Sequence, residues 1–211
     1  MKKLIFATNN KHKVEEVRAA LDGIVEIVTL AEAGLSGEIP ETADTLQGNA
    51  LQKAQWVWER THTDCFADDT GLEVDALGGA PGIHAARYAQ DIARRDGRPL
   101  PPDHDFSANI DALLAELAKH PGAPRTARFR SVVTLLLDGE MHFFEGTLEG
   151  RIAESRSGSG GFGYDPVFIA DEYPDRSVAE LPEEVKNAIS HRGKALRAMA
   201  QWIKENICVK Q

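Results

Sequence analysis

The sequence predicts an α/β fold built on a mixed β-sheet, and two observations support this prediction. Segments with helix and strand periodicity alternate along most of the 211-residue chain. Two long strand-like segments between residues 127 and 149 then interrupt the alternation with a hairpin. The chain shows no internal repeat. Alternation favours parallel strands and the hairpin adds an antiparallel pair, so a mixed sheet is expected rather than an all-parallel one.

The N-terminal region reads as a strand, a helix and a second strand. Residues 3–7 are apolar and rich in β-branched and aromatic side chains, which is typical of a strand. Asn10 is placed to cap a helix over residues 11–21, where apolar residues recur on one face. A second strand is expected over residues 24–30. Residues 34–44 contain glycine, proline and acidic residues and are expected to form a loop.

A second helix is expected to begin at a cap formed by Asp44 or Thr45 and to continue to about Arg60. The next apolar segment reads as a strand that ends at two adjacent aspartates. Residues 78–82, Gly-Gly-Ala-Pro-Gly, must form a structured loop because few sequences are so demanding in conformation.

The C-terminal half combines helices with the hairpin. Residues 96–103 are expected to form an exposed connection. The strands of the hairpin, 127–137 and 141–149, meet at Asp138-Gly139, which is a strong signal for a tight turn. The remaining predicted elements are an amphipathic helix over 106–119, a Ser/Gly-rich loop over 155–163, a short helix over 182–189 and a closing helix over 194–205.

The composition is that of an ordinary soluble globular protein, with 42% hydrophobic and 27% charged residues. No apolar run approaches the roughly 20 residues that span a bilayer. The apolar run after Met1-Lys2-Lys3 stops at Thr8, which is too short for the ~7–15 residues of a signal-peptide core. We therefore expect a cytoplasmic protein that does not associate with membranes. Cys65 and Cys208 show no metal-binding or redox spacing and are expected to be free thiols.

The formal net charge of −9 argues against general nucleic-acid binding, which needs a basic face. It does not exclude a small anionic ligand. Such a ligand would need a local cationic pocket and a metal ion to neutralise it.

The segment from Phe66 to Leu72 contains Asp68-Asp69-Thr70 and reads as a buried strand that breaks at two carboxylates. Neighbouring strand residues point to opposite faces, so one carboxylate is expected to face a cleft and the other to turn away. Buried carboxylates are costly unless a cation meets them, and magnesium prefers oxygen ligands of this kind. Asp-Asp-Thr-Gly is also good turn chemistry, so an ordinary turn is the alternative.

Three further segments are candidates for binding an anionic or flat ligand. Residues 8–13 join the first strand to the first helix, whose N-terminus attracts anions; Lys13 is unfavourable there unless it binds a phosphate. The alternative is a solvated lysine on an ordinary capped helix.

The second candidate is the loop over residues 158–166. Its four glycines allow a ligand to approach the backbone, and Phe162 or Tyr164 has a ring that can stack on a heterocycle. The alternative is an aromatic plug that pins the loop to the core. The third candidate is Lys186 with residues 190–194, which supply cations and donors just before the closing helix. A basic cap on an exposed helix is the alternative there.

Together these segments resemble the inosine triphosphate pyrophosphatase family, also called the dITP/XTP pyrophosphatases. The motifs follow the family order over nearly the whole chain, and the ordered set is far more specific than any one motif. They are Thr8-Asn9-Asn10 with Lys13, Asn49-Ala50 with Lys53, Ala67 to Leu72, Leu77 to Gly82, Ala86-Arg87-Tyr88, Gly160 to Pro166 and Ser190-His191-Arg192-Gly193.

The resemblance implies one ITPase-like α/β domain over residues 1–211, with an elongated mixed sheet flanked by helices in two lobes around a central cleft. It implies a homodimer. It also implies Mg²⁺-dependent hydrolysis of ITP, dITP and XTP to the monophosphate and pyrophosphate, which removes deaminated purines from the nucleotide pool. The partner is then a small-molecule purine nucleoside triphosphate, with no role for nucleic acid or membrane.

The resemblance also assigns roles to residues. Asp69 is implied as the general base or a metal ligand, with Glu41 and Asp68 as accessory carboxylates at the metal. His191 and Arg192 would donate hydrogen bonds to the base, and Phe162 would stack on it. The other substrate-binding residues that the resemblance implies are Thr8, Asn9, Asn10, Lys13, Lys53, Thr70, Arg87, Gly163, Tyr164, Asp165 and Lys186.

Two other functions remain open at this point. One is a related pyrophosphatase that acts on modified pyrimidine nucleotides, which Phe162 and Ser190-His191-Arg192 disfavour. The other is a regulator that binds the nucleotide without cleaving it, which the retained Asp68-Asp69 and Lys13 disfavour.

Overall fold

The computed structural model describes residues 1–206, apart from the side chains of Lys11 and His12, and confirms the α/β class. Cys208, expected to be a free thiol, lies outside the described residues. The strands are β1 (Lys2–Phe6), β2 (Val25–Val28), β3 (Cys65–Val74), β4 (Pro81–Gly82), β5 (Thr126–Leu137), β6 (Glu140–Ile152) and β7 (Phe168–Ala170). The helices are α1 (Lys11–Ala20), α2 (Leu46–Thr61), α3 (Tyr88–Arg95), α4 (Phe106–Ala118), α5 (Glu183–Ile189) and α6 (His191–Asn206).

The seven strands form one mixed sheet, as predicted. Its order is β2-β1-β3-β5-β6-β7, with β4 beside β3. β1 runs parallel to β2 and to β3, whereas β4 is antiparallel to β3 and β7 is antiparallel to β6. The predicted hairpin turn is also confirmed, because Asp138 and Gly139 both have positive φ angles of 50° and 83°, as a primed two-residue turn requires.

The chain divides into two compact units. The first comprises residues 1–69, 131–146 and the described residues from 191 onward; the second comprises residues 70–130 and 147–190. Each unit has a hydrophobic core of its own. The cleft that the resemblance implies stays a prediction.

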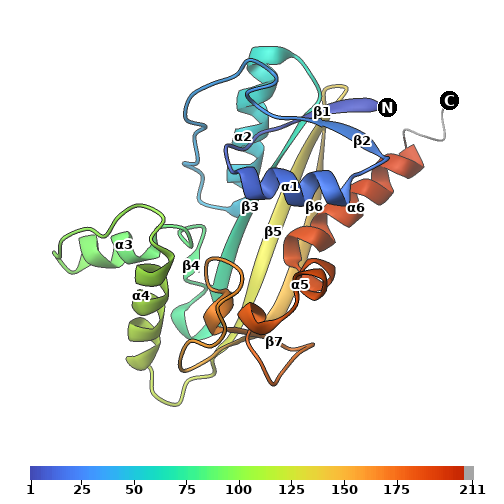
Figure 1. Ribbon diagram of the computed structural model, residues 1–211. Helices are drawn as coiled ribbons and strands as arrows, with labels where there is room; N and C mark the ends of the chain where they lie inside the picture. The colour runs from blue at the N-terminus through green and yellow to red at the C-terminus, as the bar shows by residue number, and fades with distance from the viewer. Residues whose placement is uncertain (207–211) are drawn as a thin grey trace. The chain divides into compact units, whose positions relative to one another are not determined.

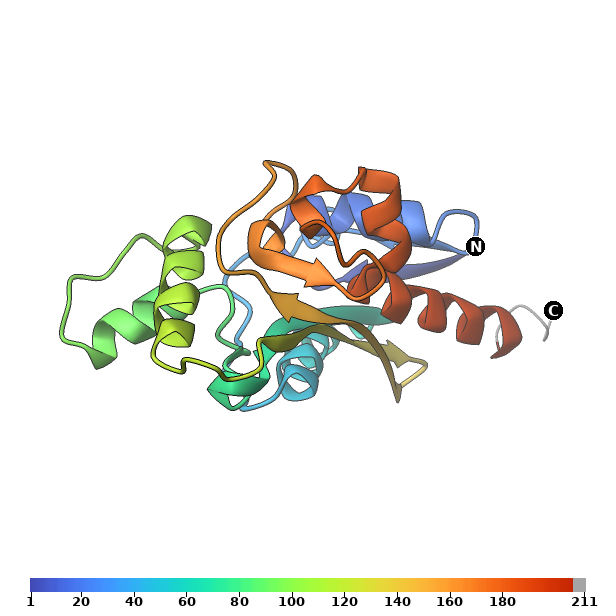
Figure 2. The ribbon, with the colours of Figure 1, turned by 90° about the horizontal axis from the view of Figure 1, so that it is seen from below.

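In the first unit, helices cover both faces of the sheet. α1 and α6 lie on one face and α2 lies on the other (Figures 1 and 2). Under α1 and α6, a core cluster includes Phe6 and Phe66, whose rings stack with centroids 4.5 Å apart. Under α2, a second cluster includes Ala54, Val57 and Cys65. Two-sided coverage explains why residues 4–7, at the end of β1, read as a continuous apolar run.

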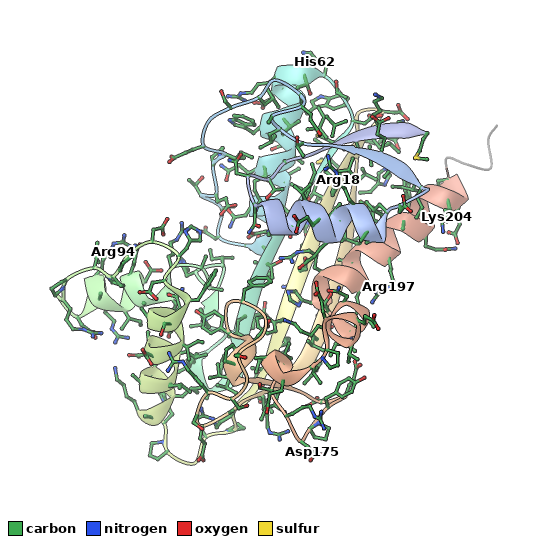
Figure 3. The ribbon with its side chains drawn as sticks, in the orientation of Figure 1. Arg18, His62, Arg94, Asp175, Arg197 and Lys204 are labelled. Carbon is green, nitrogen blue, oxygen red and sulfur yellow. The ribbon has the colours of Figure 1, made fainter. Side chains whose placement is uncertain are left out.

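The ends of the first two helices follow the sequence. The Asn10 side chain accepts a hydrogen bond from the Lys13 N–H at 3.3 Å, and Thr45 accepts one from Gly48 at 2.9 Å. His62 adopts the left-handed conformation that ends α2, and Arg18 on α1 binds the Glu32 carboxylate at 3.1 Å (Figure 3). The predicted caps are therefore confirmed, with Thr45 as the cap of α2.

The second unit has one large core, and it contains a helix that the sequence did not predict. α3 packs beside α4, whose Ile110, Leu113 and Leu117 point into the core as expected (Figure 1). α3 is only eight residues long. Its signal is weak because about two turns of apolar spacing do not distinguish a helix from a loop in the sequence.

None of the helices in residues 1–206 is long and apolar enough to cross a membrane.

Candidate active site

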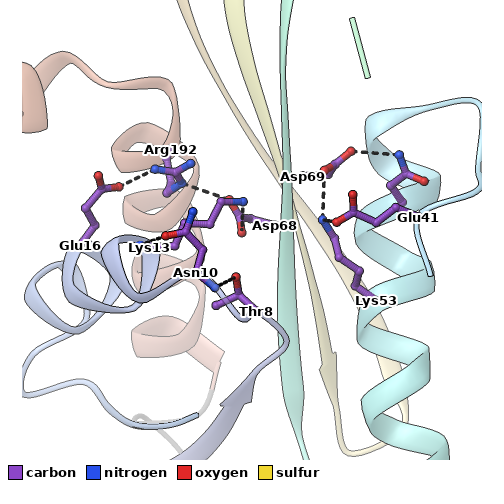
Figure 4. Close-up of polar contacts among 10 residues, drawn as sticks. Thr8, Asn10, Lys13, Glu16, Glu41, Lys53, Asp68, Asp69 and Arg192 are labelled. Atoms are coloured by element: carbon purple, nitrogen blue, oxygen red, sulfur yellow. Dashed lines mark hydrogen bonds and ion pairs between the residues drawn. The ribbon is translucent and has the colours of Figure 1, made fainter. Parts of the chain in front are cut away.

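β3 does not break at the two aspartates, contrary to the sequence prediction. The strand runs from Cys65 through Asp68, Asp69 and Thr70 to Val74, so the turn alternative is also wrong. The side chain of Asp68 points toward α1 and α6, whereas that of Asp69 points toward α2 (Figure 4). Cations meet the carboxylates on both faces, which is why a buried strand tolerates two adjacent charges.

On the first face, Lys13, Glu16, Asp68 and Arg192 form a connected ion-pair network, here called the Asp68 cluster (Figure 4). The Lys13 ammonium binds both oxygens of Asp68 at 3.0 and 2.9 Å, and the Arg192 Nε binds Oδ2 at 3.1 Å. The Arg192 Nη1 donates to Glu16 at 2.6 Å. Asp68 is 2% exposed and Arg192 is 4% exposed. The solvated-lysine alternative for Lys13 is therefore wrong.

Charge neutralisation sets the state of Asp68. Burial alone would raise its pKa, but Lys13, Arg192 and Lys53 outweigh burial and hold the pKa well below its ordinary value. Burial lowers the pKa of Lys13, and the attraction to Asp68 opposes this. Asp68 is therefore ionised at neutral pH, and both its oxygens accept hydrogen bonds from cations.

On the second face, Glu41, Asn49, Lys53 and Asp69 form the Asp69 cluster. The Lys53 ammonium bridges the carboxylates of Asp69, at 3.0 Å, and Glu41, at 2.8 Å. The Asn49 Nδ2 donates to the other oxygen of Asp69 at 3.2 Å, and its own carbonyl accepts the Ala43 N–H at 2.9 Å. Lys53 and Asn49 thus each hold one oxygen of Asp69, and both side chains are themselves fixed by a second hydrogen bond.

In the Asp69 cluster, the pKa of the aspartate is raised, whereas in the Asp68 cluster it is lowered. Burial raises the pKa of Asp69, and the nearby Glu41 charge adds to this rise while Lys53 opposes it. Burial opposes the charge on Lys53, but Asp69, Asp68 and Glu41 together raise its pKa. Two consecutive aspartates therefore have pKa values displaced to opposite sides of the ordinary value.

Glu41 and Asp69 are the two carboxylates that could hold a metal ion, because Lys53 binds both. Mg²⁺ usually binds one or two carboxylates and completes its shell with waters and phosphate oxygens, so these two oxygen donors fit it. The structure does not bring Asp68 together with them, because Asp68 lies on the opposite face of β3. Within residues 1–206, no group of three or more His, Cys, Asp or Glu side chains is arranged to hold a metal.

The predicted phosphate segment forms the start of α1. Thr8 accepts the Asn10 N–H at 3.2 Å, and Asn10 caps the helix. The Asn9 amide makes only a long contact with the Gly37 carbonyl, at 3.5 Å. The first turn of α1 contains no acidic residue. This helix N-terminus therefore offers donors and a positive dipole end to an anion.

α6 begins three residues earlier than predicted, so His191 and Arg192 lie in its first turn rather than before it. Ser190 is the C-terminal cap of α5, and the two helices follow each other directly. The near-complete burial of Arg192 contradicts an exposed basic cap. Burial and the neighbouring Arg192 charge lower the pKa of His191 to about 3, so the imidazole is neutral at neutral pH.

In the second unit, Asp165 organises the glycine-rich loop. Its Oδ2 accepts the Lys186 ammonium at 2.7 Å and the Phe162 N–H at 3.1 Å. Gly161 has a φ angle of +79°, and a Cβ there would overlap the Asp165 carboxylate and the Lys186 ammonium. Glycine at this position therefore allows the carboxylate and the lysine to lie against the backbone.

The two aromatics of this loop differ in environment. Tyr164 is 4% exposed and its hydroxyl donates to the Ala85 carbonyl at 2.8 Å, so it is the plug that the alternative described. Burial raises its pKa. Phe162 is 49% exposed, and its ring is available to a ligand. Gly163, between them, has a positive φ of 61°.

The last two predicted residues are Thr70 and Arg87. Thr70 follows Asp69 on β3 and is half-buried. Arg87 is half-buried and directly precedes α3.

Sequence reasoning missed one member of the Asp68 cluster. Glu16 lies one helical turn after Lys13 on α1, a spacing that places both side chains on one face. An acidic residue at that spacing is common on solvated helices, so only the position of Arg192 reveals its role.

Comparisons with known proteins agree with the motifs. The model of the Ham1 family matches residues 4–202. A protein of Porphyromonas gingivalis named dITP/XTP pyrophosphatase is 53% identical over 210 residues and covers all of both chains. A Bacillus subtilis protein of the same name is 40% identical over 205 residues, which span 96% of this chain and 98% of the relative.

Solved structures give the same result. A HAM1 protein from Coxiella burnetii aligns with a TM-score of 0.85 at 32% identity, over 97% of this chain and all of its own. A nucleoside-triphosphatase, or dITP/XTP pyrophosphatase, from Mycobacterium abscessus aligns with a TM-score of 0.74 at 39% identity, over 93% and 98%. The resemblance inferred from the motifs is confirmed. The chain, matched over almost its whole length in sequence and in structure, belongs to the Ham1 family.

Proposed function

We propose that this chain, a hydrolase acting on nucleoside triphosphates, is a Mg²⁺-dependent pyrophosphohydrolase that converts ITP, dITP and XTP to the monophosphate and pyrophosphate. The observation that carries the proposal is the Asp69 cluster: a buried carboxylate with a raised pKa, fixed by Lys53 and Asn49 beside a second carboxylate. The names of the relatives from Porphyromonas gingivalis and Bacillus subtilis support the choice of substrates.

Asp69 is assigned as the general base. It takes a proton from the attacking water while the phosphoanhydride bond between the α- and β-phosphates breaks. In the metal-free protein, burial raises the pKa of Asp69, which suits this task because a base is most effective when its pKa lies nearer the working pH. Asn49 and Lys53 hold the two carboxylate oxygens in place, so the base needs no reorientation before it acts.

Glu41 and Asp69 would hold Mg²⁺, which when bound neutralises phosphate charge and acidifies a water molecule. Lys53 binds both carboxylates and so keeps them together before the nucleotide arrives. Asp68 has a different role in this proposal: it holds Lys13 and Arg192 in position through ion pairs.

The triphosphate is a polyanion, and the chain carries a formal charge of −9, so local cations must bind it. Lys13 and Lys186 are both oriented by a carboxylate, Asp68 and Asp165 respectively. Lys53 serves as a third phosphate contact. The remaining substrate contacts in this proposal are Thr8, Asn9, Asn10, Thr70, Arg87, Gly163 and Tyr164.

His191, Arg192 and Phe162 select the base. Hypoxanthine and xanthine carry a carbonyl oxygen at position 6, where adenine carries an amino group. His191 is neutral and has one N–H donor, and Arg192 has N–H donors beyond the two that bind Asp68 and Glu16. Donors aimed at position 6 leave adenine with an unpaired donor, which is strongly discriminating in a buried site. The half-exposed ring of Phe162 stacks on the base.

We also propose that the protein works as a homodimer in the cytoplasm, where the nucleotide pool is located. Sedimentation velocity of the purified protein tests the dimer directly.

The test of the proposal is Asp69→Asn, which keeps the shape and the neighbours of the side chain but removes the base. Turnover of ITP is expected to fall by about 10²–10⁴-fold, while the circular dichroism spectrum shows that the fold is retained. Asp22→Asn, an exposed aspartate beyond α1, serves as the matched control and is expected to retain activity. Near-normal turnover in Asp69→Asn would exclude this residue as the base.

A further inference from the structure

Two exposed aromatic rings touch each other in the second unit. Phe106 is the first residue of α4 and is 42% exposed, and Phe162 in the glycine-rich loop is 49% exposed. Their ring centroids lie 6.3 Å apart at an interplanar angle of 54°. This separation falls within the range of favourable aromatic pairs. Two large apolar rings that meet while both remain half-exposed form an open apolar surface rather than part of the core.

The same loop is also tied to the first turns of α4 by a polar brace. The Arg156 guanidinium donates to the Asp111 carboxylate at 2.8 Å and to the Ser107 carbonyl at 2.8 Å. The first turn of α4 is itself fixed, because Asp105 accepts the Ala108 N–H at 2.9 Å. The loop between β6 and β7 accordingly lies beside α4 in both views of the ribbon (Figures 1 and 2).

The ring of Phe162 needs such a support. Gly160, Gly161 and Gly163 flank it, and Gly161 and Gly163 adopt positive φ angles. A ring on such a segment loses conformational freedom when it stacks on a ligand, and this loss weakens binding. The tilted ring of Phe106 limits the positions of the Phe162 ring before the ligand arrives, while the Arg156 brace limits movement of the backbone.

We propose that Phe106 is a positioning residue for base recognition: it supports the ring of Phe162, on which the purine of the substrate stacks. This inference rests on the proposed function, because it takes Phe162 as the residue that stacks on the base. It adds α4 to the elements that determine affinity for the nucleotide. Phe106 acts through Phe162 and has no part in the chemical step.

The test compares Phe106→Ala, Phe162→Ala, the double variant and the conservative Phe106→Tyr. KM and kcat for ITP are measured together with the inhibition constant of inorganic tripolyphosphate, a phosphate ligand that has no base. Phe106→Ala is expected to raise KM by about 3- to 10-fold and to leave kcat and the tripolyphosphate constant nearly unchanged. Phe106→Tyr, which keeps the aromatic ring, is expected to have the KM of the wild type. The double variant is no worse than Phe162→Ala alone, because both residues act on one contact.

A matched control is Phe143→Ala, which removes an equally exposed phenylalanine from β6 in the first unit and is expected to change nothing. If Phe106→Ala lowers the melting temperature, Phe106→Leu replaces it and keeps the apolar bulk without the ring. A KM that rises in Phe162→Ala but not in Phe106→Ala would overturn the inference and leave the proposed function standing, as would additive effects in the double variant.

A wild-type protein that does not release pyrophosphate from ITP would contradict the proposed function, and this result is distinct from those above. In that case the variants are compared by the dissociation constant of a non-hydrolysable ITP analogue, measured by calorimetry. Weaker binding by Phe106→Ala supports the inference even then, and equal binding overturns it.

Discussion

Asp68 and Asp69 differ more in chemistry than two adjacent residues of the same type usually do. Asp68 has a depressed pKa and is held by two cations, whereas Asp69 has a raised pKa and shares one lysine with Glu41. Strand geometry creates this difference, because it places each side chain in a different environment. Groups whose surroundings drive their pKa values apart are typical of acid–base sites, and here only Asp69 is suited to accept a proton.

For Asp68 we predict a stability role that depends on pH. Asp68→Asn leaves the half-buried Lys13 without its anion and the buried Arg192 with Glu16 alone, which is expected to cost about 3–5 kcal/mol in the free energy of unfolding. The pKa of Asp68 is depressed in the folded protein, so its contribution is present above the ordinary aspartate pKa of about 3.9 and is lost as the pH falls toward the folded value. The difference between wild type and variant should therefore shrink below about pH 4.

Urea unfolding at several pH values measures this effect. Asp175→Asn, which removes an exposed aspartate of the second unit (Figure 3), is the control and should stay within about 0.5 kcal/mol of wild type. Equal unfolding midpoints for Asp68→Asn and wild type at pH 7 would contradict the assignment of Asp68 as the anchor of the two cations.

At the scale of elements, the position of α6 depends on a glycine in β6. A Cβ on Gly146 would overlap the His191 carbonyl, the Ala195 amide and the Lys194 side chain. The strand and the first turn of the helix therefore pack backbone against backbone. This contact places His191 and Arg192, which both lie in that turn, at a fixed distance from the sheet.

We predict that Gly146→Ala displaces the start of α6. The expected loss of stability is about 1–3 kcal/mol, as for other overpacked sites. The preference for ITP over ATP, measured as the ratio of kcat/KM values, should also decrease because the base-reading residues move. Thr147→Ala on the same strand is the control for a loss of strand propensity alone. An unchanged substrate ratio in a destabilised Gly146→Ala protein would show that α6 does not fix the base-reading residues.

The elements show how far the sequence alone predicts this structure. The caps at Asn10 and Thr45 and the turn at Asp138-Gly139 were predictable because each depends on a few neighbouring residues. The continuation of β3 through Asp68-Asp69 was not predictable, because it depends on cations from α1, α2 and α6 that are distant in sequence. The same reason hid Glu16 and the contact at Gly146. The motifs identified the family, whereas the ion pairs that separate the two aspartates required the structure.

At the scale of the whole molecule, charge explains why a divalent cation is expected. The cations of the Asp68 and Asp69 clusters are Lys13, Lys53 and Arg192, and four carboxylates bind them: Glu16, Glu41, Asp68 and Asp69. Three positive charges and four negative charges do not attract a triphosphate. The chain as a whole is also strongly acidic, at −9. Mg²⁺ held by Glu41 and Asp69 would reverse this local balance.

The most direct test of the account is pyrophosphate release from ITP, dITP, XTP, GTP, ATP and dTTP, measured with magnesium and again with a chelator. We predict fast release from ITP, dITP and XTP, slow release from the other three, and loss of all release in the chelator. Release that is indiscriminate among the six nucleotides would contradict base selection by His191 and Arg192. Release that persists in the chelator would contradict the role given to Mg²⁺ at Glu41 and Asp69.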